Sequence, residues 1–194
     1  MSENGSQFRL LRQRRFLPFF CTQFFGAFND NVYKNALMIL LAFHASALTT
    51  LSSGTLVNLC GALFILPFFL LSALAGQLAD MRDKARLIRI IKACEVGIML
   101  VGGCGLLLAW NRISVEALSI PLMLAALLAM GVHSSFFGPI KYAILPQQLE
   151  SSELIGGNAL VETGTSIAIL AGMMLGGWMV TQPGWGIAGV AVCT

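Results

Sequence analysis

Asp30 and Lys34 are the residues whose types and spacing point most directly to chemistry. They lie four positions apart in an apolar segment, and Asn29 and Asn31 flank the aspartate. Residues at i and i+4 share one face of a helix, so the two charges can pair. Because ionisable side chains inside a membrane helix are costly, we expect these four residues to bind a substrate or line its cavity. The alternative is a structural pair that locks this helix to a neighbour.

A second set of polar residues lies further along the chain. Asn158 and Glu162 are one helical turn apart in an apolar segment, and Lys141 follows Pro139. We expect Asn158, Glu162 and Lys141 to bind substrate or line the same cavity. Alternatively, Glu162 pairs with a residue on a neighbouring helix. Lys141 could instead extend to the lipid phosphates. We expect His133 to hydrogen-bond with neighbouring helices rather than to relay protons.

A third set occupies a short polar stretch between two apolar segments. Its members are Gly76, Asp80, Arg82 and Lys84. Gly76 would let a neighbouring backbone approach closely, and Asp80 can cap a helix or pair with the adjacent cations. The alternative is an ordinary basic loop on the cytoplasmic side of a membrane.

The elements that position these residues follow from the composition. Hydrophobic residues make up 57% of the chain and charged residues 11%, and no charged residue occurs between His44 and Asp80 or from Thr163 to Thr194. Runs of this length exceed the roughly 20 apolar residues that a membrane-spanning helix needs. The sequence therefore predicts an all-α membrane protein, with every backbone polar group satisfied inside a helix.

Five complete helices and the start of a sixth are expected after a basic cytoplasmic segment at residues 1–15. The helices cover residues 16–43, 56–79, 87–110, 118–140 and 154–180. The sixth begins after residue 184 and is cut off at residue 194. In the fifth, small residues recur at every fourth position and predict close helix packing: Gly164, Ala168, Gly172 and Gly176.

The basic residues of the short loops predict the orientation in the membrane. Lysines and arginines gather at residues 9–15, 82–92 and 141, whereas Arg112 is the one basic residue in the loops of the other side. Cytoplasmic loops carry an excess of lysine and arginine, so the N-terminus is expected in the cytoplasm. The sequence contains no metal-binding constellation, nucleotide loop, catalytic triad or nucleic-acid groove, so we expect no cofactor and a transporter instead of an enzyme.

The polar stretch at residues 76–86 resembles the G-x-L-A-D-R-x-G-R-R loop of the major facilitator superfamily. The matching residues are Gly76, Leu78, Ala79, Asp80 and the basic Lys84, whereas Met81 and Asp83 replace an arginine and a glycine. The resemblance implies that Asp80, Arg82 and Lys84 pair with charges of a second half and hold the outward-open state. It also implies a fold of twelve helices, of which this chain supplies the first six-helix half, with helix 6 truncated.

Residues 24–31 and 34–37, together with 138–142 and 157–162, look like one branch of that superfamily, the bacterial lysophospholipid transporters. The branch implies a multi-pass protein of the bacterial inner membrane that moves lysophosphatidylethanolamine inward by alternating access. Its partners would be membrane lipids, the substrate and the second six-helix half of the same chain. Some members are fused to an acyltransferase, which would follow residue 194.

The resemblance and the charges together give a mechanism and its alternatives. Asp30 would pair with the ethanolamine amine, and Lys34 or Lys141 with the phosphate. One alternative is a facilitator that exports hydrophobic drugs or cations. Another is a membrane module that anchors a fused lipid acyltransferase.

Overall fold

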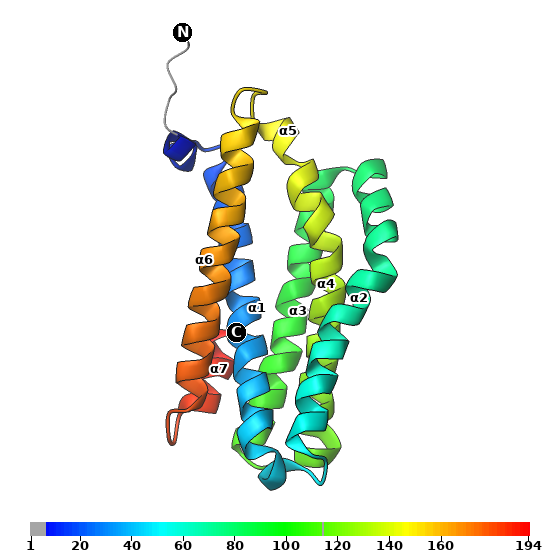
Figure 1. The fold of residues 1–194 in the computed structure, drawn as a ribbon, viewed down its shortest axis with the longest axis vertical. Coiled ribbons are helices and arrows are strands. Elements are labelled where there is room, and N and C mark those ends of the chain that lie inside the picture. The colour runs from blue at the N-terminus through cyan, green and yellow to red at the C-terminus, as the bar shows by residue number, and fades with distance from the viewer. Residues whose placement is uncertain (1–6, 114) are drawn as a thin grey trace.

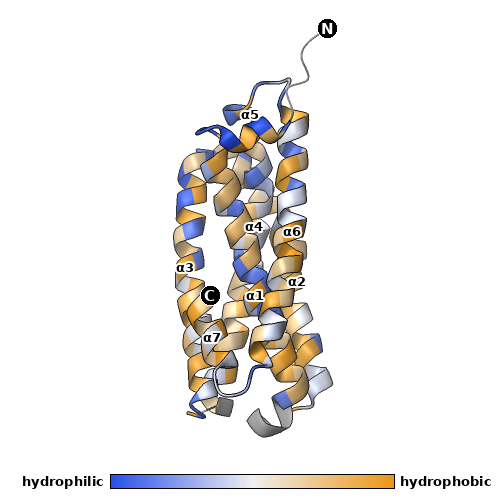
Figure 2. Cartoon of the chain, turned by 90° about the vertical axis from the view of Figure 1, so that its left-hand side faces the viewer, coloured by the Kyte–Doolittle hydropathy of each residue, from blue (hydrophilic) through white to orange (hydrophobic). Residues whose placement is uncertain are grey.

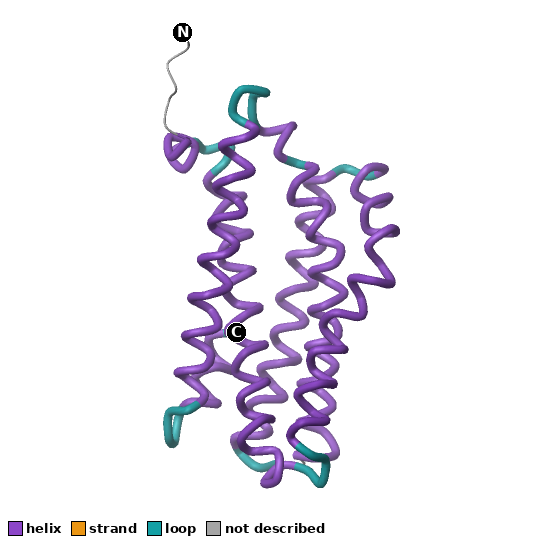
Figure 3. The backbone as a smooth tube through the Cα atoms, viewed as in Figure 1, coloured by secondary structure: helices purple, strands orange, loops and turns teal. Residues whose placement is uncertain are grey.

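The computed structural model describes residues 7–113 and 115–194 as a bundle of helices (Figure 1). The long helices are α1 (Leu17–Leu48), α2 (Ser53–Met81), α3 (Lys84–Trp110), α4 (Ile120–Ala143) and α6 (Leu154–Val180). The shorter elements are η1 (Gln7–Arg12), the π-helical turn η2 (Val115–Ser119), α5 (Leu145–Gln148) and α7 (Gly186–Cys193). Figure 3 shows helices and loops, and no strand, in the part of the chain that the structure describes.

The surface of this bundle suits a membrane. By length and composition, four helices of the described chain can span one, namely α2, α3, α6 and the run at 117–143 that contains α4. Their outward side chains are apolar, as Phe69 (80% exposed) and Ile155 (84% exposed) illustrate. Figure 2 shows hydrophobic residues along most of each helix and hydrophilic ones gathered at the end that carries α5. The predicted all-α, multi-pass membrane protein is confirmed.

The fifth predicted helix has the same bounds as α6, but the other helices begin or end at residues that differ from the predicted ones. α1 extends five residues beyond its predicted end, and α2 and α3 each begin three residues early. The early starts have a capping cause: the Ser52 hydroxyl accepts a hydrogen bond from the Thr55 N–H, and the Asp83 carboxylate accepts one from the Arg86 N–H at 2.7 Å. Such side chains satisfy backbone donors that the first helical turn leaves unpaired.

The connection between α2 and α3 differs from expectation in two respects. Asp83, and not Asp80, provides the helix cap; Asp80 is exposed in the last turn of α2. Gly76 was expected to admit a close backbone, yet no described atom lies within 4 Å of the position that a Cβ would take there. The open space is limited to the face of α2 that carries Gly76, because Ala75 and Ala79 of the same helix end are buried.

α2 bends, and its C-terminal part leans away from the rest of the bundle (Figure 1). Pro67 lies inside this helix. A proline within a helix removes one backbone hydrogen bond and its ring clashes with the preceding turn, which kinks the helix. Before the bend, α2 packs closely on α4, where Gly131 lies against the backbone of Phe64.

The predicted small-residue ridge of α6 packs against α1, as expected. A Cβ added at Gly172 would collide with the carbonyl oxygen of Phe28, and one added at Gly176 with that of Val32. The contact between α1 and α6 is the most extensive in the bundle. These glycines therefore set the distance between the two helices.

Two clusters of buried apolar residues fill the space between the helices at different levels of the bundle. The larger contains Tyr33, Leu37, Leu106 and Met123, and the Tyr33 hydroxyl donates to the Met123 carbonyl at 2.9 Å. The smaller lies at the N-terminal end of α1 and is centred on residues such as Phe16, Leu145 and Val161. Along α1, Asp30 lies between these clusters, and Lys34 and Asn35 lie among the first residues of the larger one.

An ion pair fastens that end of the bundle. Arg15, just before α1, contacts the carboxylate of Glu153, just before α6, at 2.7 Å. The backbone N–H of Glu150 donates to the same carboxylate at 3.0 Å. This hydrogen bond, and then the Arg15 guanidinium, hold the pKa of Glu153 below its ordinary value of 4.5.

Substituting Gly176→Ala should destabilise the bundle, because the new methyl group forces the α1 backbone away. Overpacking of this kind costs about 1–3 kcal/mol. We expect a lower thermal midpoint for the detergent-solubilised protein. Gly97→Ala, on α3 where a Cβ meets no described atom within 4 Å, is the matched control. Equal midpoints for the two variants would contradict the close contact.

Substituting Glu153→Gln should lower the thermal midpoint slightly at neutral pH. The pKa of Glu153 is lowered by folding, so its carboxylate stabilises the fold at neutral pH, and this contribution is lost as pH falls through the folded pKa. The difference between parent and variant should therefore close below pH 4.5. Glu150→Gln serves as control, and a difference that persisted at low pH would exclude the ion pair as its cause.

Candidate functional site

A cavity of about 430 Å³ lies between α1, α2, α4 and α6 at the level of the polar residues of α1. Three phenylalanines contribute apolar walls, namely Phe64, Phe68 and Phe137. The polar side chains that line it are Gln23, Asp30, Asn31, Lys34, Asn35, Lys92, His133, Ser134, Lys141 and Thr165. Sequence positions more than a hundred residues apart thus meet at one site.

Asp30 is held at the cavity wall by one hydrogen bond. The Ser134 hydroxyl of α4 donates to its Oδ2 at 3.3 Å. Its Oδ1 is buried and accepts no hydrogen bond from the described chain. A buried carboxylate oxygen without a donor is costly unless a ligand or water supplies one.

Lys34 also faces the cavity, but it does not pair with Asp30. Among the described residues, no ion pair joins the two side chains, so the expected i, i+4 pairing is not formed. The Lys34 ammonium instead lies 4.4 Å from the centre of the Phe64 ring. The negative face of an aromatic ring attracts a cation, which favours this position without neutralising the charge.

The amides of α1 serve mainly to fix that helix. The Thr165 hydroxyl of α6 donates to Gln23 Oε1 at 2.9 Å, and Asn35 donates to the Met173 carbonyl at 2.6 Å. Asn31 donates to the Ala27 carbonyl of its own helix. Asn31 was an expected cavity residue, whereas Gln23 was not assigned a role. Both side chains are buried and line the cavity, and each also makes a hydrogen bond that holds α1 in place.

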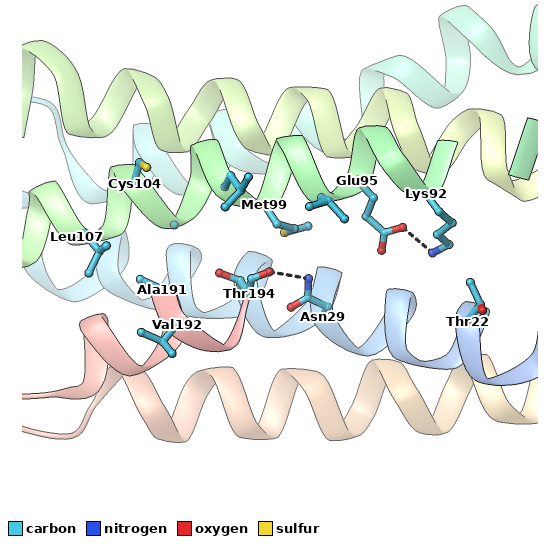
Figure 4. Close-up of a pocket in the computed structure, with 13 residues that line it drawn as sticks. Thr22, Asn29, Lys92, Glu95, Met99, Cys104, Leu107, Ala191, Val192 and Thr194 are labelled. Carbon is cyan, nitrogen blue, oxygen red and sulfur yellow. Dashed lines mark hydrogen bonds and ion pairs between the residues drawn. The ribbon is translucent and has the colours of Figure 1, made fainter. Parts of the chain in front are cut away.

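Asn29 faces a different space from its neighbours. It donates to the backbone carbonyl of Thr194 at 3.2 Å and lines a second hollow of about 470 Å³ between α1, α3 and α7 (Figure 4). Lys92 lines both hollows, and Glu95 lies beside it in the second. Lys92 is therefore common to the linings of the two spaces.

Lys92 and Glu95 of α3 are the polar residues that the sequence analysis missed. Lys92 Nζ lies 2.5 Å from Glu95 Oε2 (Figure 4) and 4.5 Å from the centre of the Phe137 ring. His133 Nε2 of α4 lies 3.2 Å from the same glutamate oxygen. Glu95 could have been found as an acidic residue within an apolar segment. Lys92 was overlooked because it was counted with the basic residues of the loop before α3.

The expected ligands near the end of α4 and on α6 divide into two groups. Lys141 lines the cavity, 3.7 Å from Glu162 Oε1 and 4.8 Å from the centre of the Tyr142 ring. Glu162 is more than half exposed and meets Lys141 at the rim. Asn158 is exposed and does not line the cavity. The loop residues lie outside the cavity lining as well: Gly76, Asp80, Arg82 and Lys84.

Known proteins resemble the chain along nearly its whole length. Residues 19–193 match the family model of the Major Facilitator Superfamily. Curated relatives named lysophospholipid transporter LplT include those of Photorhabdus laumondii (28% identical; 81% of this chain, 34% of that protein), Yersinia enterocolitica (27%; 91% and 39%) and Cronobacter sakazakii (28%; 99% and 42%). The chain thus spans well under half the length of these relatives. No solved structure matches it.

The cavity should admit water-soluble reagents, because charged side chains line it. In a variant without the five natural cysteines, Lys34→Cys should react with a charged thiol reagent that cannot enter hydrocarbon. The control is Leu170→Cys, on the apolar outer face of α6, where that residue is 63% exposed. Labelling should be at least about tenfold faster at position 34, as expected for an aqueous site against a lipid-facing one. Equal rates would contradict an aqueous cavity.

Proposed function

Because this chain belongs to the Major Facilitator Superfamily, we propose that it moves lysophospholipid across the bacterial inner membrane by alternating access. The relatives named lysophospholipid transporter support this substrate class. The observation that carries the proposal is the cavity itself, which is lined by a carboxylate and an ammonium group that form no ion pair within the described chain, and by aromatic rings. A lysophospholipid head with an amine and a phosphate presents the complementary charges.

Asp30 is the proposed ligand of the head-group amine. Its Oδ2 accepts one hydrogen bond from Ser134, and its Oδ1 has no donor within the described chain. An ammonium group at Oδ1 would supply that donor and neutralise the buried charge. Ser134 would keep the carboxylate oriented while ligands exchange.

Lys34 is the proposed ligand of the phosphate. Its contact with the Phe64 ring leaves the ammonium protons available, and no described carboxylate neutralises it. Lys92 and Lys141 already pair with Glu95 and Glu162. Lys34 therefore offers the stronger attraction for an incoming anion.

The single acyl chain of the substrate would lie on apolar surfaces. Phe64, Phe68 and Phe137 line the cavity and provide such surfaces next to the charged groups. The rest of the acyl chain would extend along helix faces toward lipid. A head held by charges and a tail held by aromatic contacts distinguish a lysolipid from a small polar solute.

The proposed orientation places the N-terminus in the cytoplasm. η1, α5 and the connection between α2 and α3 lie at one end of the bundle (Figure 1), and most lysines and arginines belong to that end. The positive-inside rule supports the cytoplasmic side for it. A second six-helix half would complete the cavity. Charge pairing across the two halves would involve the connection residues Gly76, Asp80, Arg82 and Lys84.

Replacing Asp30 by asparagine tests the site. We expect uptake of labelled lysophosphatidylethanolamine into spheroplasts without endogenous lysolipid uptake to fall about tenfold or more, because a charged hydrogen bond is lost. The complete gene should be expressed, and abundance in the membrane measured for every variant. Glu150→Gln, which removes an exposed carboxylate outside the cavity, is the matched control and should retain uptake.

The outcomes separate the alternatives. Parental uptake in the Asp30→Asn variant at equal abundance would remove Asp30 as a ligand. If the unsubstituted protein is abundant in the membrane and no uptake occurs, the lysophospholipid proposal is wrong and an exporter of hydrophobic cations is favoured. Uptake that survives every cavity substitution, with abundance alone affected, would indicate a module that anchors a fused acyltransferase.

A further inference from the structure

A separate pocket of about 400 Å³ lies at the end of the bundle opposite α5 (Figure 1). It is bounded by the C-terminal parts of α1, α3 and α6 and by the start of α7. Its lining includes Ile39, Phe43, His44, Trp110, Thr181 and Trp185. Three of these side chains carry benzene or indole rings, and no lysine, arginine or acid belongs to the described lining.

The two tryptophan rings of this pocket are held in place by the surrounding chain. Trp110 Nε1 donates to the Gly184 carbonyl at 3.2 Å. The Trp185 ring meets the Trp178 ring edge-on, with centroids 5.9 Å apart, and a Cβ added at Gly189 would collide with it. Trp110 and Trp185 are nevertheless 44% and 47% exposed, so each presents ring surface to a ligand. Rings fixed in this way lose little conformational freedom when a ligand binds.

The electrostatics of the pocket favour a cation. The face of an aromatic ring attracts an ammonium group, and tryptophan attracts it most strongly. α3 and α6, each of 27 residues, both end here, and the C-terminus of a helix carries a partial negative charge. α7 begins at the same place with its positive end, but the N–H of Gly186 already donates to the Gln182 carbonyl at 3.1 Å.

Arg112 adds a positive charge beside this pocket. It lies two residues beyond Trp110, is exposed, and pairs with no described carboxylate. A simple cation would gain nothing from its guanidinium. A head group that carries an ammonium next to a phosphate would satisfy the rings and the guanidinium together, because arginine forms charged hydrogen bonds with phosphate oxygens.

The pocket lies next to the cavity along α1. Asn35 lines the cavity and Ile39 lines the pocket, one helical turn further along the chain. Four helical residues advance by about 6 Å. Both side chains also contact the same part of α6, since each lies close to the position that a Cβ would take at Gly177. A head group in the pocket would thus be one turn away from the polar lining of the cavity.

We propose that this pocket binds the ammonium group of a lysophospholipid that lies in the outer leaflet, before the lipid enters the cavity. The ammonium lies against the rings of Trp110 and Trp185, the phosphate faces Arg112, and the acyl chain stays in the surrounding lipid. The role in uptake rests on the proposed function and orientation, whereas the binding of an ammonium group does not. Tryptophans that only anchor the bundle at a membrane surface are the alternative, and they would not distinguish between head groups.

Saturation-transfer NMR with glycerophosphocholine, a soluble probe, tests the pocket without a membrane-bound ligand. The complete gene product is used in nanodiscs free of choline lipids, and the trimethylammonium protons are observed. Trp110→Leu and Trp185→Leu should weaken binding about fivefold, as expected for the loss of a cation–π contact. Trp110→Phe, which keeps a ring, should retain most of the affinity. Phe69→Leu, which removes an exposed ring on α2, is the matched control and should bind like the parent.

Two further comparisons make this test specific. Glycerophosphoglycerol, which has no ammonium group, should give no signal that depends on Trp110. The glycerophosphocholine signal should persist in Asp30→Asn, which alters the cavity alone. A signal that Asp30→Asn abolishes and Trp110→Leu leaves unchanged would overturn the pocket, as would no signal with folded parent protein. Equal losses of binding in Trp110→Phe and Trp110→Leu, with lowered thermal midpoints, would indicate a packing role and also overturn it.

Uptake kinetics of the complete gene product test the role in transport. Trp110→Leu should raise the KM for lysophosphatidylethanolamine severalfold with little change in kcat. The KM for lysophosphatidylglycerol, whose head group lacks an ammonium, should stay unchanged. An equal rise for both lipids, or no rise despite weakened glycerophosphocholine binding, would overturn the docking step. An absence of lysolipid uptake by the parent, with glycerophosphocholine binding that depends on Trp110, would overturn the proposed function and support the pocket.

Discussion

The close contact between the glycines of α6 and the backbone of α1 is the constraint on which the site depends. Gly172 and Gly176 lie against the carbonyl groups of Phe28 and Val32, which flank Asp30 along α1. A larger side chain at either glycine would displace the turn that carries the aspartate. The hydrogen bond from Thr165 to Gln23 then fixes the rotation of α1 about its axis. The geometry of the cavity is thus determined by backbone packing, which decides where the charged side chains lie.

Given that packing, each charged group near the middle of the bundle finds a partner of a particular kind. Lys34 lies over the ring of Phe64 and Asp30 accepts a hydroxyl hydrogen bond, whereas Lys92 combines a contact with the Phe137 ring and an ion pair with Glu95. Aromatic faces and hydroxyls stabilise charge without cancelling it, unlike a complete ion pair. Such partners keep buried charges tolerable and leave them able to attract ions, which suits a transporter better than a purely structural bundle.

The sequence predicted the helices well because long apolar runs leave a chain in lipid no other structure. It predicted the α6 ridge because small residues recur on one face. It could not give the rotation of each helix relative to its neighbours, which is a tertiary property. Asn158 therefore proved exposed, and Glu95 gained its importance only when α4 brought His133 beside it. Within the described chain the expected Asp30–Lys34 ion pair is not formed, and Lys34 lies instead over the ring of Phe64, which belongs to another helix.

The cavity lies where α1 and α6, which share the most extensive helix contact of the bundle, face α2 and α4. Across it, α1 and α4 meet in few places, such as the bonds from Tyr33 to Met123 and from Ser134 to Asp30. Hydrostatic pressure acts on internal void volume, so it would compress this cavity before the close contact between α1 and α6 yields.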